Sequence, residues 1–152
     1  VERKVQHLPP FQGVRACLDR MQLHADIMVV SQTPAEALVR EWELNGMMDD
    51  VAFIAGQELG TKTQHLALAT RDRYPPAHVL MIGDAPGDCR AAQANGALFF
   101  PVNPTREEAS WRRLQDEAFD RFIAGAYAGA YQQQLIDEFD ALLPDTPPWV
   151  TP

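Results

Sequence analysis

The stretch "HVLMIGDAPGD" (His78–Asp88) decides the predicted fold, because a run of apolar residues in it stops abruptly at a glycine. The run Val79–Ile82 is typical of a short buried strand. Two acids, Asp84 and Asp88, follow the strand directly and are separated by a turn-forming Pro-Gly pair. Other short apolar runs alternate with helix-like stretches on both sides. This alternation predicts an α/β fold built on a parallel sheet.

The bounds of the expected elements follow from these runs and from local start and stop signals. Four strands are expected, at Asp26–Val30, Val51–Gly56, His78–Gly83 and Ala97–Val102. An early helix is expected over Val14–His24. Three later helices are expected to begin at capping boxes, at Thr33–Glu36, Thr61–Gln64 and Thr105–Glu108. Two helices are expected to stop at Asn-Gly pairs, which end at Gly46 and Gly96.

The chain of 152 residues suits one compact domain. We expect a core over residues 1–103, a helical extension of the same domain over 104–143, and a proline-rich tail over 144–152. Gly125 and Gly129 weaken the helical pattern of the extension and predict a break there. Large apolar residues recur at helical spacing in the extension, and we expect them to pack on the domain's own core: Phe119, Phe122, Ile123, Tyr127, Tyr131, Leu135 and Phe139.

Composition excludes several classes of partner. The formal net charge of −8 argues against nucleic acid and anionic membranes as main partners. Apolar runs fall short of the ~20 residues needed to cross a bilayer, and the sequence does not open on a signal peptide. Cys17 and Cys89 lie far apart, which indicates free thiols in a reducing, cytoplasmic compartment. The four histidines show no ligand-spaced pair, so zinc is not expected.

Polar side chains stand where the predicted strands end, which is where parallel α/β sheets bind ligands. They are Ser31 and Gln32 after the first strand, Lys62 at the helix start after the second, Asp84 and Asp88 after the third, and Asn103 and Thr105 after the fourth. A hydroxyl, backbone N–H groups and an ammonium suit a phosphate. Carboxylates suit Mg²⁺. Together these groups point to magnesium-assisted phosphoryl transfer.

Each of these residues also has an ordinary structural interpretation. A serine at a strand end commonly caps a turn, and a lone lysine is commonly solvated. The pair Asp84 and Asp88 fits a turn followed by a helix N-terminus. Lys62 is the least ordinary of them, since it stands at the helix end where a positive charge is unfavourable. The functional interpretation therefore depends on all the motifs occurring in order at the strand ends.

In that order the chain resembles the haloacid dehalogenase (HAD) superfamily of phosphohydrolases, over roughly Gly13–Val102. "IMVVSQT" resembles the second motif of the family, "LGTKTQHL" the third and "MIGDAPGDCRAAQANG" the fourth. The resemblance implies a Rossmann-like, three-layer parallel sheet. It also implies roles for single residues: Ser31, with Gln32, would hold the phosphoryl group, Lys62 would neutralise charge, Asp84 would bind Mg²⁺ directly and Asp88 would support the metal shell.

The nucleophile that the resemblance implies is missing from the chain. In the family, a strand ending in D-x-D supplies an aspartate that carries the phosphoryl group as an aspartyl-phosphate. The acids outside the fourth motif that we considered lie on helix-like stretches, before a strand or in the tail: Asp19, Asp49, Asp50, Asp137, Asp140 and Asp145. We therefore expect the C-terminal part of a longer enzyme for a small phosphorylated metabolite, inactive by itself.

The missing strand also has a structural consequence. In the family it lies between the strand that ends at Ser31 and the strand that ends at Gly83. Without it, two apolar inner edges are exposed and offer a route to self-association. We expect the two flanking strands to pair directly, a partner chain to fill the gap, or residues before Val1 to supply the strand. A gap left open to water would count against the resemblance.

Two other functions are weighed against the enzyme. A non-catalytic, HAD-like remnant that binds phosphate or a protein remains an alternative. A phospho-acceptor domain of the receiver type uses similar groups, but its acids come first and its hydroxyl and lysine follow. In this chain Ser31 and Lys62 precede Asp84, which disfavours a receiver domain.

Overall fold

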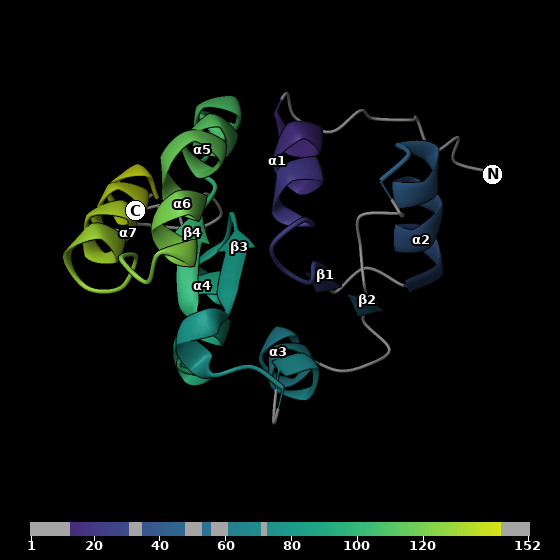
Figure 1. Cartoon of the computed structure of the whole chain (residues 1–152), viewed down its shortest axis with the longest axis horizontal. Helices are drawn as coiled ribbons and strands as arrows, with labels where there is room; N and C mark the ends of the chain where they lie inside the picture. Colours follow the sequence, from purple (N-terminus) through teal and green to yellow (C-terminus); the bar gives the residue numbers. More distant parts are fainter. Residues whose placement is uncertain (1–12, 31–34, 48–52, 56–60, 71–72, 144–152) are drawn as a thin grey trace, which may run out of the picture.

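The chain folds into a mixed α/β structure, described by a computed structural model over residues 13–30, 35–47, 53–55, 61–70 and 73–143 (Figure 1). The strands are β1 (Met28–Val30), β2 (Phe53–Ala55), β3 (Leu80–Gly83) and β4 (Leu98–Pro101). The α-helices are α1 (Val14–Met21), α2 (Ala35–Leu44), α3 (Lys62–Thr70), α4 (Pro86–Ala94), α5 (Glu107–Arg113), α6 (Phe119–Ile123) and α7 (Ala130–Leu142). A π-helical turn over Leu114–Ala118 joins α5 to α6.

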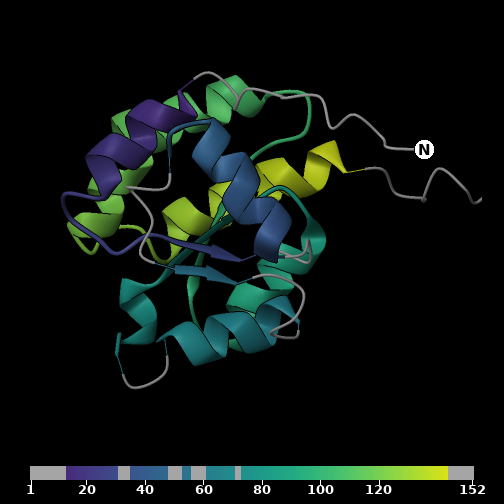
Figure 2. The ribbon, with the colours of Figure 1, turned by 90° about the vertical axis from the view of Figure 1, so that its right-hand side faces the viewer.

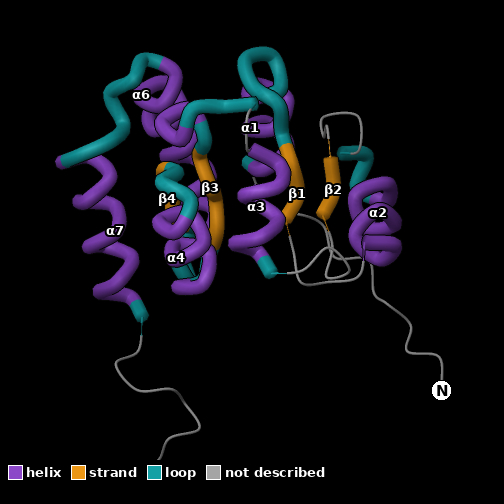
Figure 3. The backbone as a smooth tube through the Cα atoms, turned by 90° about the horizontal axis from the view of Figure 1, so that it is seen from below, coloured by secondary structure: helices purple, strands orange, loops and turns teal. Residues whose placement is uncertain are grey.

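The described strands form two separate parallel pairs. β1 pairs with β2, and β3 pairs with β4 with Leu80 opposite Leu98 and Gly83 opposite Pro101. The pair β1–β2 lies between α2 and α3 (Figure 2). β3 lies on the side of β1 that is opposite β2, as seen from below in Figure 3. Within the described residues, β1 and β3 do not pair. Direct pairing of the strands that end at Ser31 and Gly83 is therefore wrong.

Most local start and stop signals that fall on described residues are confirmed. At the start of α3, the backbone N–H of Gln64 donates to Thr61 Oγ1 over 3.2 Å, and the N–H of Thr61 donates to Gln64 Oε1 over 2.9 Å. Gly46 and Gly96 follow α2 and α4 with φ of 66° and 67°, a left-handed conformation that favours glycine. The box at Thr33–Glu36 includes residues outside the described part of the chain.

The capping box predicted at Thr105–Glu108 is wrong. Thr105 adopts a left-handed φ of 66°, and its N–H donates to Glu107 Oε1 over 3.1 Å. Arg106 then takes the N-cap position of α5, without a side-chain cap. Glu107 has thus replaced Glu108 as the partner of Thr105, because the turn of the backbone at Thr105 moves the helix start by one residue.

The C-terminal helices pack against α1 and the sheet. The chain breaks between α6 and α7, where Gly125 and Gly129 have φ of 75° and 90°, which confirms the predicted break. Four residues of the predicted apolar stripes are buried, namely Phe119, Tyr127, Leu135 and Phe139. Ile123, by contrast, is 51% exposed. The main core cluster joins α1 to this region, through Cys17, Leu18, Leu114, Ala118 and Phe119.

The outer edge of β4 is sealed by side chains. The backbone N–H of Phe99 donates to Gln132 Oε1 over 2.7 Å, and the hydroxyl of Tyr127 donates to the Phe99 carbonyl over 2.6 Å. Both backbone groups of Phe99 point away from β3, because a residue of a parallel strand directs its N–H and C=O to the same neighbour. At Phe99 this edge is therefore closed to a further strand.

We predict that Tyr127→Phe lowers the free energy of unfolding by about 1–2 kcal/mol, because it leaves a buried carbonyl without its donor. Tyr127 is completely buried. Tyr131→Phe is the matched control, since the Tyr131 hydroxyl donates to Glu117 at an exposed position and should matter less. Urea unfolding followed by circular dichroism measures both. Equal losses in the two variants would contradict the prediction.

Candidate functional site

A cavity separates the two strand pairs. Its volume is about 670 Å³, and β1 and β3 both line it, together with Leu66 of α3. The wall is largely apolar, but Lys62, Asp84 and Asp88 stand at the carboxyl ends of the strands. This central cavity occupies the place where the missing strand was expected. Among the described residues no strand closes this gap, and an open gap counts against the resemblance to the HAD superfamily.

The backbone of β3 turns unpaired groups toward this central cavity. Leu98 N–H donates to the Val79 carbonyl over 2.9 Å, and Val102 N–H donates to the Gly83 carbonyl over 2.8 Å. Because the direction alternates along a parallel strand, Leu80 and Ile82 direct their N–H and C=O groups away from β4. Among the described residues, backbone hydrogen bonds do not cross to β1. The inner edge of β3 is thus free to pair with another strand.

The carboxylate of Asp88 organises the carboxyl end of β3. Its Oδ2 accepts the N–H groups of Asp84 and Ala85, each over 3.1 Å, and its Oδ1 pairs with Lys62 Nζ. Asp88 is buried, with 2% of its surface exposed, and lies in the first turn of α4. Three bonds to ionised or backbone donors satisfy a buried carboxylate that would otherwise be costly. Asp88 therefore fixes the turn after β3 and draws Lys62 from α3 to it.

Gly83 leaves room for this arrangement. A Cβ atom built at Gly83 would overlap the carboxylate and Cβ of Asp88. The backbone of β3 can come this close to α4 only where a side chain is absent. The glycine before the first acid of the motif is therefore a packing requirement of Asp88.

The structure brings together three of the predicted site residues and leaves two outside its description. Lys62, Asp84 and Asp88 all line the central cavity. Asp84 is exposed, and its carboxylate has no hydrogen bond or ion pair within the described residues. Ser31 and Gln32 lie outside the described residues.

The donor set fits a magnesium site only in part. Asp84 offers a free carboxylate, the kind of ligand that Mg²⁺ takes together with water and phosphate oxygens. Both oxygens of Asp88 are already engaged, so this side chain supports the site from behind. Within the described ranges, three His, Cys, Asp or Glu side chains do not gather into a metal-binding group. Any further protein ligand would have to come from another segment.

Two buried polar side chains have atoms without a partner; the sequence analysis missed His65 and named Asn103 only as a polar residue at a strand end. His65 lies on α3, one turn after Lys62, with 2% of its surface exposed, and within the described ranges neither ring nitrogen has a hydrogen-bond partner. Asn103, after β4, has a buried Oδ1 that likewise finds no partner in the described part of the chain. Helical spacing places His65 near the face of Lys62, but burial without a partner is a property of the folded chain and has no sequence signature.

The cysteines are free thiols in the described structure, as expected. Burial raises the pKa of Cys17 to about 11, and its thiol donates to the Trp111 carbonyl over 3.1 Å. Burial also raises the pKa of Cys89. Both thiols are therefore protonated at neutral pH, which makes them poor nucleophiles and poor metal ligands.

Comparisons of the chain with protein-family models, with curated proteins and with solved structures found no match. Among the helices of the described ranges, none combines the length and the apolar character that a membrane crossing requires. The site must therefore be interpreted from its own geometry.

We predict that Gly83→Ala destabilises the fold by about 1–3 kcal/mol, because the new methyl group displaces the buried carboxylate of Asp88. Gly87→Ala is the matched control. Gly87 lies in α4, where a new Cβ meets only Arg90 Nη2 at 3.8 Å, so alanine should be neutral or slightly stabilising there. Thermal unfolding of the two variants measures the difference. A Gly83→Ala protein as stable as the parent would contradict this packing requirement.

A second prediction concerns the two acids. Asp88→Asn should cost about 3 kcal/mol, because it breaks a buried ion pair and disturbs the bonds to the turn after β3. Asp84→Asn should change stability by less than ~0.5 kcal/mol, since this carboxylate is exposed and unbonded in the described structure. Urea unfolding midpoints compare them. The assignment fails if the two substitutions have the same effect.

Proposed function

We propose that this chain is part of a magnesium-dependent phosphohydrolase of the HAD type, acting on a small phosphorylated metabolite. The observation that carries the proposal is the cluster at the carboxyl end of β3: a free carboxylate at Asp84, a buried carboxylate at Asp88, and the ammonium of Lys62 held between α3 and α4. This order of groups agrees with the third and fourth motifs that the sequence resembles. A Rossmann-like, three-layer sheet belongs to the same proposal.

Each side chain has a defined task in such a reaction. Lys62 is 30% exposed at its side chain while it pairs with Asp88, so its ammonium can face a bound phosphate and offset its negative charge. Asp84 would hold Mg²⁺, which would polarise the phosphoryl oxygens when bound. Asp88 would keep both groups in place from behind. Ser31 and Gln32 would bind the phosphoryl group from the end of β1.

The covalent step needs an aspartate that the chain does not contain at a suitable strand end. In the proposed enzyme, an additional strand fills the central cavity and carries this aspartate at its carboxyl end. The unpaired inner edge of β3 at Leu80 and Ile82 and the apolar wall of the cavity support a strand in that place. The aspartate would accept the phosphoryl group from the substrate, and water would then hydrolyse the aspartyl-phosphate to phosphate.

The alternative is a protein that binds phosphate without hydrolysing it. One observation favours it: of the two acids at the carboxyl end of β3, only Asp84 has a free carboxylate, and Asp88 is fully engaged. Lys62 could still bind an anion in such a protein. The two functions differ in whether phosphate is released from a substrate, and this difference can be measured.

The first experiment is to determine the coding sequence upstream of Val1 and to express the longer protein. A hydrophobic strand ending in D-x-D should precede this chain. The longer protein should then release phosphate from p-nitrophenyl phosphate only when Mg²⁺ is present. Lys62→Ala and Asp84→Asn should each lower the rate by about 10²–10³-fold, because each removes a charge that acts on the transition state.

Arg112→Gln is the control, because Arg112 is exposed on α5 and lies away from the central cavity. It should leave the rate unchanged. Phosphate binding that Lys62→Ala abolishes, without any hydrolysis, would favour the binding protein instead. Hydrolysis that is equally fast in the Lys62 and Asp84 variants would overturn the assignment of the site.

A further inference from the structure

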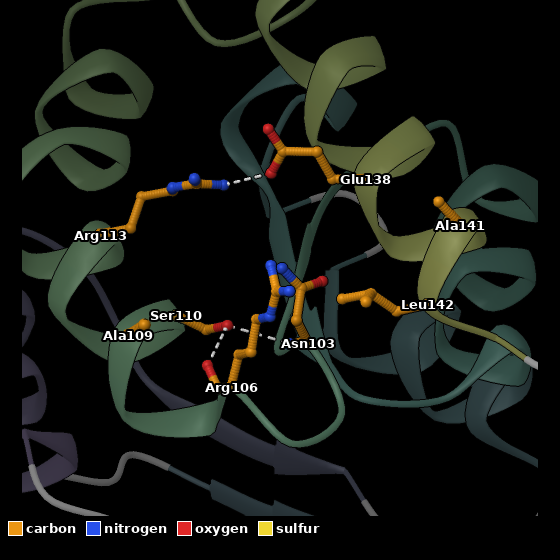
Figure 4. Close-up of a pocket in the computed structure, with 8 residues that line it drawn as sticks. All are labelled: Asn103, Arg106, Ala109, Ser110, Arg113, Glu138, Ala141 and Leu142. Atoms are coloured by element: carbon orange, nitrogen blue, oxygen red, sulfur yellow. Dashed lines mark hydrogen bonds and ion pairs between the residues drawn. The ribbon is translucent and has the colours of Figure 1, made fainter.

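A second pocket lies between α5 and α7, past the carboxyl end of β4, and shares no residue with the central cavity (Figure 4). Its volume is about 440 Å³, within the range of small-molecule sites. One face of α5 contributes Arg106, Ser110 and Arg113 at helical spacing, and one face of α7 contributes Glu138 and Leu142. We call this the α5–α7 pocket. The phosphohydrolase proposal leaves it without a role.

Asn103 forms the floor of this pocket and holds an unused acceptor. Only 9% of its surface is exposed, and its buried Oδ1 has no hydrogen-bond partner among the described residues. The surrounding backbone is well satisfied: Asn103 N–H donates to Ser110 Oγ over 2.9 Å, and this hydroxyl donates to the Arg106 carbonyl over 2.9 Å. The single proton of the Ser110 hydroxyl is therefore used, and the amide oxygen of Asn103 needs a donor from elsewhere.

The charges of the pocket favour an anion. Arg113 pairs with Glu138 over 2.6 Å across the pocket, and this hydrogen bond lowers the pKa of Glu138, so the carboxylate is ionised at neutral pH. Arg106 reaches in beside Asn103 and has no ion pair within the described residues (Figure 4). Two guanidinium groups and one carboxylate leave a charge of +1 in a chain of net charge −8. A local positive charge on an acidic protein attracts anions selectively.

We propose that the α5–α7 pocket binds a small organic anion that carries a hydroxyl group next to its charged group. The guanidinium of Arg106 binds the charged oxygens, as arginine does for both carboxylates and phosphates. The enclosed Asn103 Oδ1 becomes accessible when the amide turns about its soft terminal torsion, and the hydroxyl then donates to this orphan acceptor. Ala109, Ala141 and Leu142 contact the carbon atoms between the two groups. Hydroxy acids and phosphorylated polyols share this chemistry.

The test is a titration of the ¹⁵N-labelled chain, followed by the NMR signals of the Asn103 side-chain amide and the Arg106 Nε–H. The probes are glycerol 3-phosphate and glycerate, with inorganic phosphate and glycerol as fragments that lack one of the two groups. Saturable shifts with one or both of the complete probes, tighter than with inorganic phosphate, support the proposal. The probe that binds more tightly tells whether the anion is a phosphate or a carboxylate. Inorganic phosphate binding as tightly as both complete probes, or an absence of saturable shifts, would overturn it.

Variants separate the two halves of the recognition. Arg106→Gln should weaken binding of the preferred probe by about 10–100-fold, whereas Arg112→Gln, an exposed change on the same helix, should not. Asn103→Leu keeps the backbone bond to Ser110 and should reduce the affinity to that of the fragment without a hydroxyl. Equal binding by the Arg106 and Arg112 variants would overturn the proposal. The titration needs neither Mg²⁺ nor hydrolysis, so its outcome is independent of the phosphohydrolase.

Discussion

The buried carboxylate of Asp88 is the interaction on which the site depends. It closes the turn after β3 with two backbone hydrogen bonds and brings in Lys62 from α3. A carboxylate with 2% exposure is stable only when donors surround it, so the positions of these donors are coupled. The glycine before the turn and the lysine on the neighbouring helix follow from the same requirement. Asp84 is left free on the exposed side of the turn.

The division of the sheet is the second constraint. Two parallel pairs stand apart, and helices hold them together in place of strand pairing. Leu18 and Met21 of α1 line the central cavity and also belong to the core that includes Leu114 and Phe119. A cavity of about 670 Å³ with two strand edges facing it lowers the stability of a domain, because packing contacts and backbone hydrogen bonds are lost there.

The sequence analysis succeeded where local rules decide the structure. The box at Thr61 and Gln64 and the stops at Gly46 and Gly96 depend on backbone geometry within a few residues, and these predictions are confirmed. Thr105 shows the limit of such rules, because a left-handed backbone at this residue replaced the expected cap. Local rules could not predict the strand order either, because pairing between β1 and β3 depends on the packing of residues that are far apart in the sequence.

The site was predictable in its acids and its lysine, whose order along the chain is visible in the sequence. The sequence did not reveal which of the two carboxylates would be buried and bonded, and which would be left exposed. That both oxygens of Asp88 are engaged depends on how α4 packs under β3. The orphan Oδ1 of Asn103 and the buried ring of His65 had no signal at all, because an unsatisfied group is defined by what the fold fails to place beside it.

The sealed backbone of Phe99 has a consequence for how the domain assembles. Its partners, Tyr127 and Gln132, come from the same C-terminal half of the chain as β3 and β4. The hydrogen bonds that close the outer edge of β4 at Phe99 are therefore made within this half. A segment that satisfies its own edge strand with its own side chains is expected to open as one cooperative unit in native-state hydrogen exchange.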